Sequence, residues 1–243
     1  MNTFSDSVDT ALHLLHEFDP SLWVIVGRSL AVSATACLIG YGLGVLLGAG
    51  LAVSRFSGRG AVLVALNTLL ALPSVVVGLV VYLLLSRTGP LGTLGWLFSF
   101  KAMVLAQVIL VMPVVTALTR QVVEDVERQH GEQWASLGAG PWLRSLILAW
   151  DERMALMTIF VTAFGRAISE VGAVMIVGGN IDGFTRVMTT AIALETSKGD
   201  LPLALGLGLV LLAVVGLLNL LVVLLRGRAE ASRLGQPAVV GGL

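Results

Sequence analysis

Long stretches without a charged side chain dominate the sequence. Asp, Glu, Lys and Arg are absent from four of them, residues 29–54, 60–86, 102–119 and 201–225. A helix that rises about 1.5 Å per residue needs about 20 apolar residues to cross about 30 Å of hydrocarbon, so each stretch can span a bilayer. A fifth stretch, residues 154–179, is equally long but contains Arg166 and Glu170. The sequence therefore predicts an all-α polytopic membrane protein with about five transmembrane helices.

The overall charge supports this prediction. Only 12% of the residues are charged, against about 25% in a soluble domain. The 15 basic and 15 acidic residues cancel, which disfavours nucleic-acid binding. Neither lysine, Lys101 or Lys198, stands in a Gly-Lys-Ser/Thr motif, so ATP binding through a phosphate loop is excluded. The single cysteine, Cys37, excludes an intrachain disulfide and a cysteine-based metal site.

Arginine and lysine are distributed unevenly between the predicted helices. With an extracytoplasmic N-terminus, nine lie in cytoplasmic segments, five in extracytoplasmic segments and one, Arg166, within a predicted helix. Because cytoplasmic loops carry the excess of positive charge, this favours an outside N-terminus and a cytoplasmic C-terminus in the cell inner membrane. Residues 1–20 form a predicted extracytoplasmic amphipathic segment, with an unstructured tail as the alternative. We assign residues 21–226 to the transmembrane domain and 227–243 to a cytoplasmic tail.

Small and helix-bending residues mark particular positions in the predicted helices. Gly40, Gly44 and Gly48 repeat every four residues, which places them on one helix face and lets a second helix approach closely. Pro73 and Pro113 lie inside the second and third charge-free stretches, where each leaves a backbone carbonyl unpaired and permits a bend. We therefore expect a tight helix pair at the glycines and bends at the prolines, which either line a pathway or are plain kinks.

Residues 120–153 form a polar segment that is too long for a turn and too short for a domain. The helical pattern breaks at Gly138, so we expect a short helix that ends there. Trp134, Leu137 and Trp142 would then stand as apolar side chains on a polar surface, which suits insertion into a partner's groove. Alternatively, Trp142 and the later Trp150 anchor the segment at the membrane interface.

This segment resembles the EAA loop of ABC importer permeases. Glu132 is followed by Ala135, and Gly138 comes six residues after the glutamate in a Leu-Gly-Ala context. In that family the short helix is the coupling helix, which docks into a cleft of the cytoplasmic ATPase subunit. We call residues 120–153 the coupling segment. The resemblance assigns ATPase coupling to Glu132, Gln133, Ala135, Leu137, Gly138 and Ala139.

Further motifs are similar to those of oxyanion permeases. Residues 165–173 contain an Arg-Ala-x-x-Glu-x-Gly-Ala core and are followed by Gly-Asn-Ile at 179–181, as in molybdate and sulfate permeases. Residues 65–92 resemble the second span of the family, and residues 185–199 resemble the permease of tungstate importers more than that of molybdate importers. The resemblance extends over residues 22–225.

The resemblance implies a type I ABC importer permease for an oxyanion, with tungstate favoured and molybdate as the alternative. It implies alternating access in a homodimer, with ATP and Mg bound by two separate ATP-binding cassette subunits. An extracytoplasmic tungstate-binding protein would deliver the substrate. The chain itself would bind no cofactor or metal and would not be an enzyme.

Arg166 and Glu170 need an explanation, because an ionised side chain near the bilayer centre costs about 2.5 to 3.5 kcal/mol. Their spacing of four predicts one helix face, where they would neutralise each other. One hypothesis is a structural ion pair. The other is a gate that attracts a passing dianion through weak, multiple contacts from hydroxyl and amide donors. The candidate pathway residues are Arg166, Ser169, Glu170, Asn180, Thr189 and Thr190.

Two other classes of protein fit the sequence less well. An intramembrane enzyme would need a catalytic motif, but Gly-x-Ser-x-Gly and His-Glu-x-x-His are absent and the three histidines lie outside the predicted helices. An ion-driven carrier or channel would use Arg166 and Glu170 but would leave the coupling segment without a role.

Overall fold

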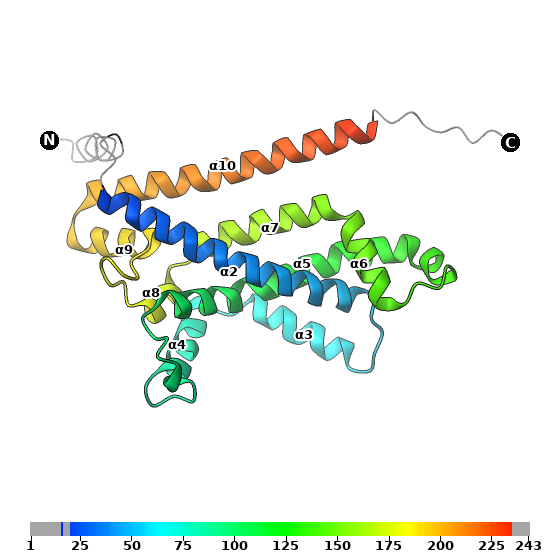
Figure 1. The fold of residues 1–243 in the computed structure, drawn as a ribbon, viewed down its shortest axis with the longest axis horizontal. Coiled ribbons are helices and arrows are strands. Elements are labelled where there is room, and N and C mark those ends of the chain that lie inside the picture. Colours follow the sequence, from blue (N-terminus) through cyan, green and yellow to red (C-terminus); the bar gives the residue numbers. More distant parts are fainter. Residues whose placement is uncertain (1–15, 17–19, 235–243) are drawn as a thin grey trace.

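Within the part of the chain that the structure describes, residues 16 and 20–234, every element of regular secondary structure is a helix (Figure 1). This computed structural model confirms the all-α prediction. The helices are α2 (Pro20–Val53), α3 (Arg59–Leu70), α4 (Ser74–Leu85), the 3-10 turn η1 (Gly92–Leu94), α5 (Phe100–Ser136), α6 (Pro141–Asp151), α7 (Arg153–Ile168), α8 (Gly172–Gly178), α9 (Met188–Lys198) and α10 (Leu201–Leu234). Most of the predicted amphipathic segment and the end of the predicted tail lie outside the described residues.

Three helices are long enough to cross a membrane alone, and two bent helix pairs reach this length only together. The apolar parts of the single helices are Leu22–Val53 in α2, Phe100–Ser136 in α5 and Leu201–Leu224 in α10. α3 and α4 are bent by 100° relative to each other, and α7 and α8 by 56°. If each bent pair is one span, the described chain has up to five spans, in agreement with the sequence.

The two prolines within the predicted spans behave differently. Pro73 directly precedes α4 at the 100° bend, where its backbone is extended and its missing N–H cannot continue a helix. Pro113 lies inside α5, which is assigned as one helix up to Ser136. The predicted bend is therefore confirmed at Pro73, whereas Pro113 does not break its helix. Neighbouring helices commonly support such a proline, and α2 contacts α5 at Val111 and Val115, on both sides of it.

The predicted glycine face packs α2 against α5. A Cβ atom on Gly44 would lie 2.7 Å from Cβ of Val115, and one on Gly48 would lie 2.5 Å from the backbone oxygen of Thr116. Gly40 is also close, at 3.1 Å from Val111. These distances leave no room for a larger side chain, so the prediction of a tight helix pair is confirmed.

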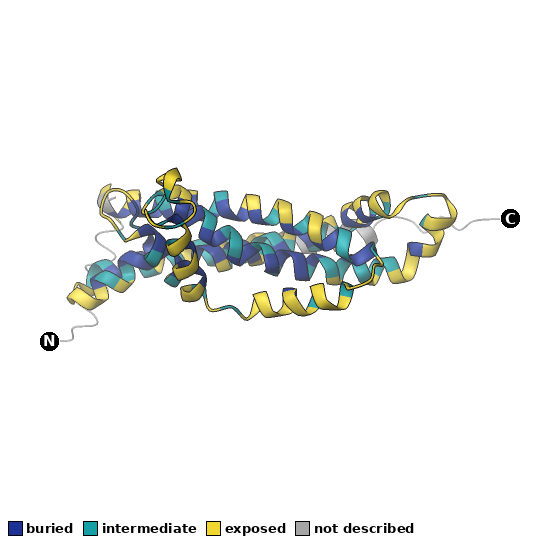
Figure 2. Ribbon diagram, turned by 90° about the horizontal axis from the view of Figure 1, so that it is seen from below, coloured by how far each residue is buried: buried dark blue, intermediate teal, exposed yellow. Residues whose placement is uncertain are grey.

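The two ends of the bundle carry different features (Figure 1). The beginning of α2 lies with α9 at one end, and the α5–α6 turn lies with the C-terminal part of α10 at the other. Two helices are poorly covered by the rest of the described chain. In α3 only Leu66 is buried, and Figure 2 shows most of this helix as exposed. In α10, only 17% of the most apolar part of the helix is buried. Such surfaces suit contact with lipid or with another chain.

Candidate functional site

The chain leaves the helix between α7 and α8, inside the motif that carries the predicted charged pair. α7 ends at Ile168, and Glu170 follows the capping residue Ser169. Because Glu170 lies beyond the end of α7, it does not continue the helix face of Arg166. No ion pair joins these two residues in the described part of the chain. The predicted ion pair is therefore wrong.

The two charges have different surroundings. Oε1 of Glu170 accepts a hydrogen bond from the backbone N–H of Ala173 at 3.1 Å, so the carboxylate satisfies an amide in the first turn of α8. Arg166 is exposed and makes no hydrogen bond or ion pair with the described residues. Its guanidinium is thus available to a group from outside the chain.

Five polar side chains from four parts of the chain meet beside this break. Glu170 lines a small pocket with Thr189 of α9, Gln107 of α5, and Ser29 and Ser33 of α2. We call these five residues the polar seam. All except Glu170 are less than 7% exposed. The polar seam therefore lies where the break between α7 and α8 meets α2, α5 and α9.

Hydrogen bonds hold the polar seam together. The hydroxyl of Thr189 donates to the backbone oxygen of Glu170 at 2.7 Å, and Nε2 of Gln107 donates to that of Ala167 at 2.9 Å. Oγ of Ser29 accepts from the N–H of Met188 at 2.6 Å. Oε1 of Gln107 is buried and has no partner within the described chain. Backbone carbonyl groups at the end of α7 and just after it thus accept hydrogen bonds from side chains of other helices.

The sequence analysis missed three members of the seam, namely Ser29, Ser33 and Gln107. Gln107 is the only amide side chain in the third charge-free stretch, and this was the signal that could have found it. Polar residues inside spans commonly face other helices rather than lipid. The serines carry a weaker signal, because a serine hydroxyl in a helix often bonds to the preceding turn, as Ser29 does with Ile25.

The other predicted pathway residues are Ser169 and Thr190, each adjacent in sequence to a residue of the polar seam, and Asn180, which bonds to Thr190. Nδ2 of Asn180 donates to the backbone oxygen of Thr190 at 3.3 Å, and Oδ1 of Asn180 is buried without a partner within the described residues. The hydroxyl of Thr190 lies 3.1 Å from the oxygen of Val187, and that of the exposed Ser169 donates to Gly165 at 2.8 Å. In this conformation the three predicted hydroxyl donors therefore bond to backbone oxygens.

The coupling segment consists of the last part of α5, an exposed turn at residues 137–140, and α6. The helix closes with two bonds, from the N–H of Gly138 to Ala135 and from that of Ala139 to Trp134, each 3.0 Å long. Gly138 has a φ of +80°, which glycine adopts at little cost. The predicted helix end at Gly138 is confirmed, but the predicted short helix is the last part of the long α5.

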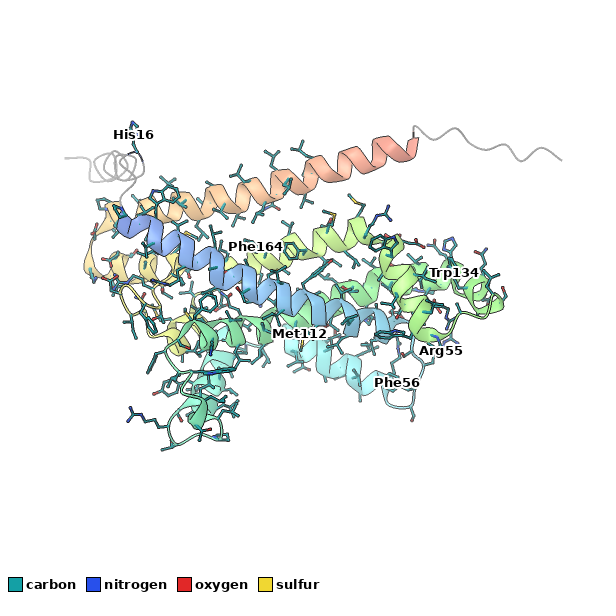
Figure 3. All side chains as sticks on the ribbon, viewed as in Figure 1. His16, Arg55, Phe56, Met112, Trp134 and Phe164 are labelled. Atoms are coloured by element: carbon teal, nitrogen blue, oxygen red, sulfur yellow. The ribbon has the colours of Figure 1, made fainter. Side chains whose placement is uncertain are left out.

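The apolar side chains of this turn divide into two groups. Leu137 is 77% exposed and Trp142 63%, so both stand on the surface as predicted. Trp134, however, is half-buried and packs against the main hydrophobic core, at the end of α5 (Figure 3). Its large apolar surface reaches the core from the inward face of the helix. Glu132, Gln133 and Ala135 are exposed.

Polar contacts brace the two helices that flank the turn. Nη1 of Arg144 in α6 lies 3.3 Å from Oε1 of Glu127 in α5 and donates to the backbone oxygen of Gly131. Both charged side chains are less than 20% exposed. The end of α5 and the beginning of α6 are therefore held as one unit that presents the turn.

The fold and these two regions define a class of protein, the multi-pass membrane permease. The described chain combines apolar helices long enough to span a membrane, a break between α7 and α8 that is lined with polar groups, and a braced turn that is exposed at one end. None of the described residues forms a cluster of three or more His, Cys, Asp or Glu side chains suited to a metal.

Comparison with known proteins identifies the family. No family model matches the chain. The chain is 41% identical to the tungstate uptake system permease protein TupB of Peptoclostridium acidaminophilum, over 90% of this chain and 96% of that protein. It is 40% identical to a probable anion ABC transporter permease of Haloferax volcanii, over 79% and 84%. It is 36% identical to TupB of Campylobacter jejuni, over 88% and 90%. The chain belongs to this family of ABC transporter permeases.

Proposed function

We propose that this chain is the permease subunit of an ABC importer that moves tungstate inward. The observation that carries the proposal is the 41% identity with a tungstate uptake permease over nearly the full length of both proteins. The chain provides the route through the membrane, and ATP hydrolysis on separate subunits drives alternating access. The chain itself is a transport subunit without enzymatic activity.

The proposed partners follow from this role. Two copies of the chain form the route, two ATP-binding cassette subunits bind ATP and Mg, and an extracytoplasmic protein delivers tungstate. The exposed turn supports ATPase docking, since Leu137 and Trp142 offer apolar surface beside polar groups. The proposed coupling residues are Glu132, Gln133, Ala135, Leu137, Gly138 and Ala139.

The proposed pathway residues act in different ways. The free guanidinium of Arg166 attracts the dianion through weak contacts, which allow the substrate to leave again. The hydroxyl groups of Ser169, Thr189 and Thr190 reach the substrate after the helix break rearranges, because their hydrogen atoms bond to backbone oxygens in the present conformation. Glu170 holds the beginning of α8, and the amide of Asn180 borders the route.

The proposed orientation places the N-terminus outside and the coupling segment in the cytoplasm. The test uses single cysteines at two exposed positions, Thr88 and His130, in a Cys37→Ala background. A membrane-impermeant thiol reagent should label Thr88→Cys from outside, and His130→Cys after the cytoplasmic face is opened. Labelling of His130→Cys in intact cells would contradict the orientation.

Uptake in proteoliposomes tests the function itself. The chain is reconstituted with its ATPase subunit, and the binding protein is added outside with tungstate. We expect tungstate uptake that requires ATP and the binding protein, and that a small excess of molybdate does not inhibit. Uptake without ATP would favour a channel or ion-driven carrier, and stronger transport of molybdate would reassign the substrate.

A further inference from the structure

A cluster of charged side chains centred on Glu124 connects three helices at the coupling-segment end of the bundle. Oε1 of Glu124 in α5 lies 3.2 Å from Nη2 of Arg59, the first residue of α3. Oε2 of Glu124 pairs with Arg120, one turn earlier in α5. Nε of Arg59 also donates to the backbone oxygen of Leu51 at 3.3 Å, near the end of α2. We call Arg59, Arg120 and Glu124 the Glu124 clamp.

The clamp is partly shielded from water. The side chains of Arg59 and Glu124 are each 25% exposed, and that of Arg120 is 18% exposed. By contrast, the neighbouring pair Asp125–Arg128 is 65% and 71% exposed and lies within α5 alone. Exposed pairs of this kind contribute little to structure, whereas a shielded carboxylate between two guanidinium groups fixes the position of both. The two pairs thus provide a test site and a matched control on the same helix.

α3 depends on this clamp because little else in the described chain holds it. Leu66 is its only buried residue (Figure 2). Gly58, with a φ of +93°, precedes the helix, and the 100° bend before α4 follows it. The helix is therefore held at its beginning by Arg59 and is free to change its angle at its end.

The same helix that carries Glu124 also carries the exposed turn. α5 is assigned as one helix from Phe100 to Ser136, so Glu124 and Glu132 are about 12 Å apart along its axis at about 1.5 Å per residue. A shift of the turn along or about the axis of α5 moves Glu124 with it. Through the ion pair with Arg59, this shift also moves the beginning of α3.

We infer that Glu124 is a positioning residue that transmits movement of the exposed turn after α5 to α3, and so to the bent pair that α3 forms with α4. This inference rests on the proposed function, because it assumes that an ATPase moves the turn. The residue acts through Arg59 and does not touch the substrate. Glu124→Gln keeps the shape of the side chain but removes the charge that holds Arg59.

The first measurement tests the clamp without any partner. Nitroxide labels are placed at two exposed positions, Val64 in α3 and Gln121 in α5, in a Cys37→Ala background. Pulsed electron paramagnetic resonance should give a narrow distance distribution in the parent protein and a broad or displaced one in Glu124→Gln. The control Asp125→Asn should match the parent. Identical distributions in all three would overturn the inference.

The second measurement uses the complete importer in proteoliposomes and compares tungstate uptake per ATP hydrolysed. We expect a fall of at least about fivefold in Glu124→Gln, the lower end of usual coupling between two sites. Asp125→Asn should keep the parent ratio, and Arg59→Gln should add no further loss to Glu124→Gln. An unchanged ratio in Glu124→Gln, or an equal loss in Asp125→Asn, would refute the inference. Absence of tungstate uptake by the parent importer would instead refute the proposed function.

Discussion

Replacing Gly48 by alanine tests the packing of α2 against α5 on its narrowest contact. The new Cβ would lie 2.5 Å from the backbone oxygen of Thr116 and 2.8 Å from Cβ of Thr119. A backbone oxygen cannot rotate away as a flexible side chain does, so the two helices must separate. Gly50→Ala is the matched control, because nothing lies within 4 Å of its Cβ position on the same helix.

The expected magnitude follows from the difference between the two variants. Both gain the same helix propensity, about 1 kcal/mol, when glycine becomes alanine. Only Gly48→Ala also carries the cost of overpacking, typically about 1 to 3 kcal/mol. For a chain of this size 1 kcal/mol corresponds to a Tm change of about 2 to 4 °C. We therefore expect Gly48→Ala to unfold about 2 to 12 °C below Gly50→Ala.

The protein carries its own probe for this measurement. Cys37 is the only cysteine in the sequence and is fully buried in α2. A thiol-reactive fluorophore therefore reports unfolding in detergent as Cys37 becomes accessible. Equal midpoints for the two alanine variants would refute the claim that α2 and α5 are in contact at Gly48.

Three further outcomes are expected. Gly138→Ala should lose ATPase stimulation in the assembled importer, because a φ of +80° costs a residue with a side chain about 1 to 2 kcal/mol. Gly140→Ala should retain the stimulation, because Gly140 has a φ of −67° that alanine adopts without strain. Arg166→Ala should leave the free energy of unfolding unchanged, Glu170→Ala should lower it by about 1 kcal/mol through the lost amide contact, and the double variant should show the sum of the two changes; stability regained in the double variant would instead support the ion pair. Gln107→Leu should change the unfolding free energy by less than about 1 kcal/mol, since it removes one hydrogen bond and one unpaired buried oxygen; a larger loss would show that the seam depends on this amide.

The spans and the tight helix pair were predictable because they depend on properties that repeat along the sequence. A bilayer requires long apolar stretches, and the glycine spacing matches the period of a helix. The bend at Pro73 follows from the chemistry of a single residue. Each of these features is local, so one sequence suffices to find it.

The interior of the site was less predictable, because it depends on where helices end and on what meets there. The spacing of Arg166 and Glu170 implied one face only if the helix continued, but α7 ends at Ile168. Gln107 reaches Ala167 from 60 positions earlier in the chain, a contact that periodicity does not reveal. Trp134 faced the core rather than the surface for the same reason, since tertiary packing decides which side of α5 is covered.

The long helices α5 and α10 have unequal apolar lengths, and this has a consequence for the membrane. The charge-free part of α5, residues 102–119, extends about 27 Å, and that of α10, residues 201–225, about 37 Å. One bilayer cannot match both apolar lengths if the two helices stand parallel to the membrane normal. Tilting shortens the thickness that α10 needs to cover. Transport should therefore depend on bilayer thickness, because thicker lipids would draw α10 upright against the rest of the bundle.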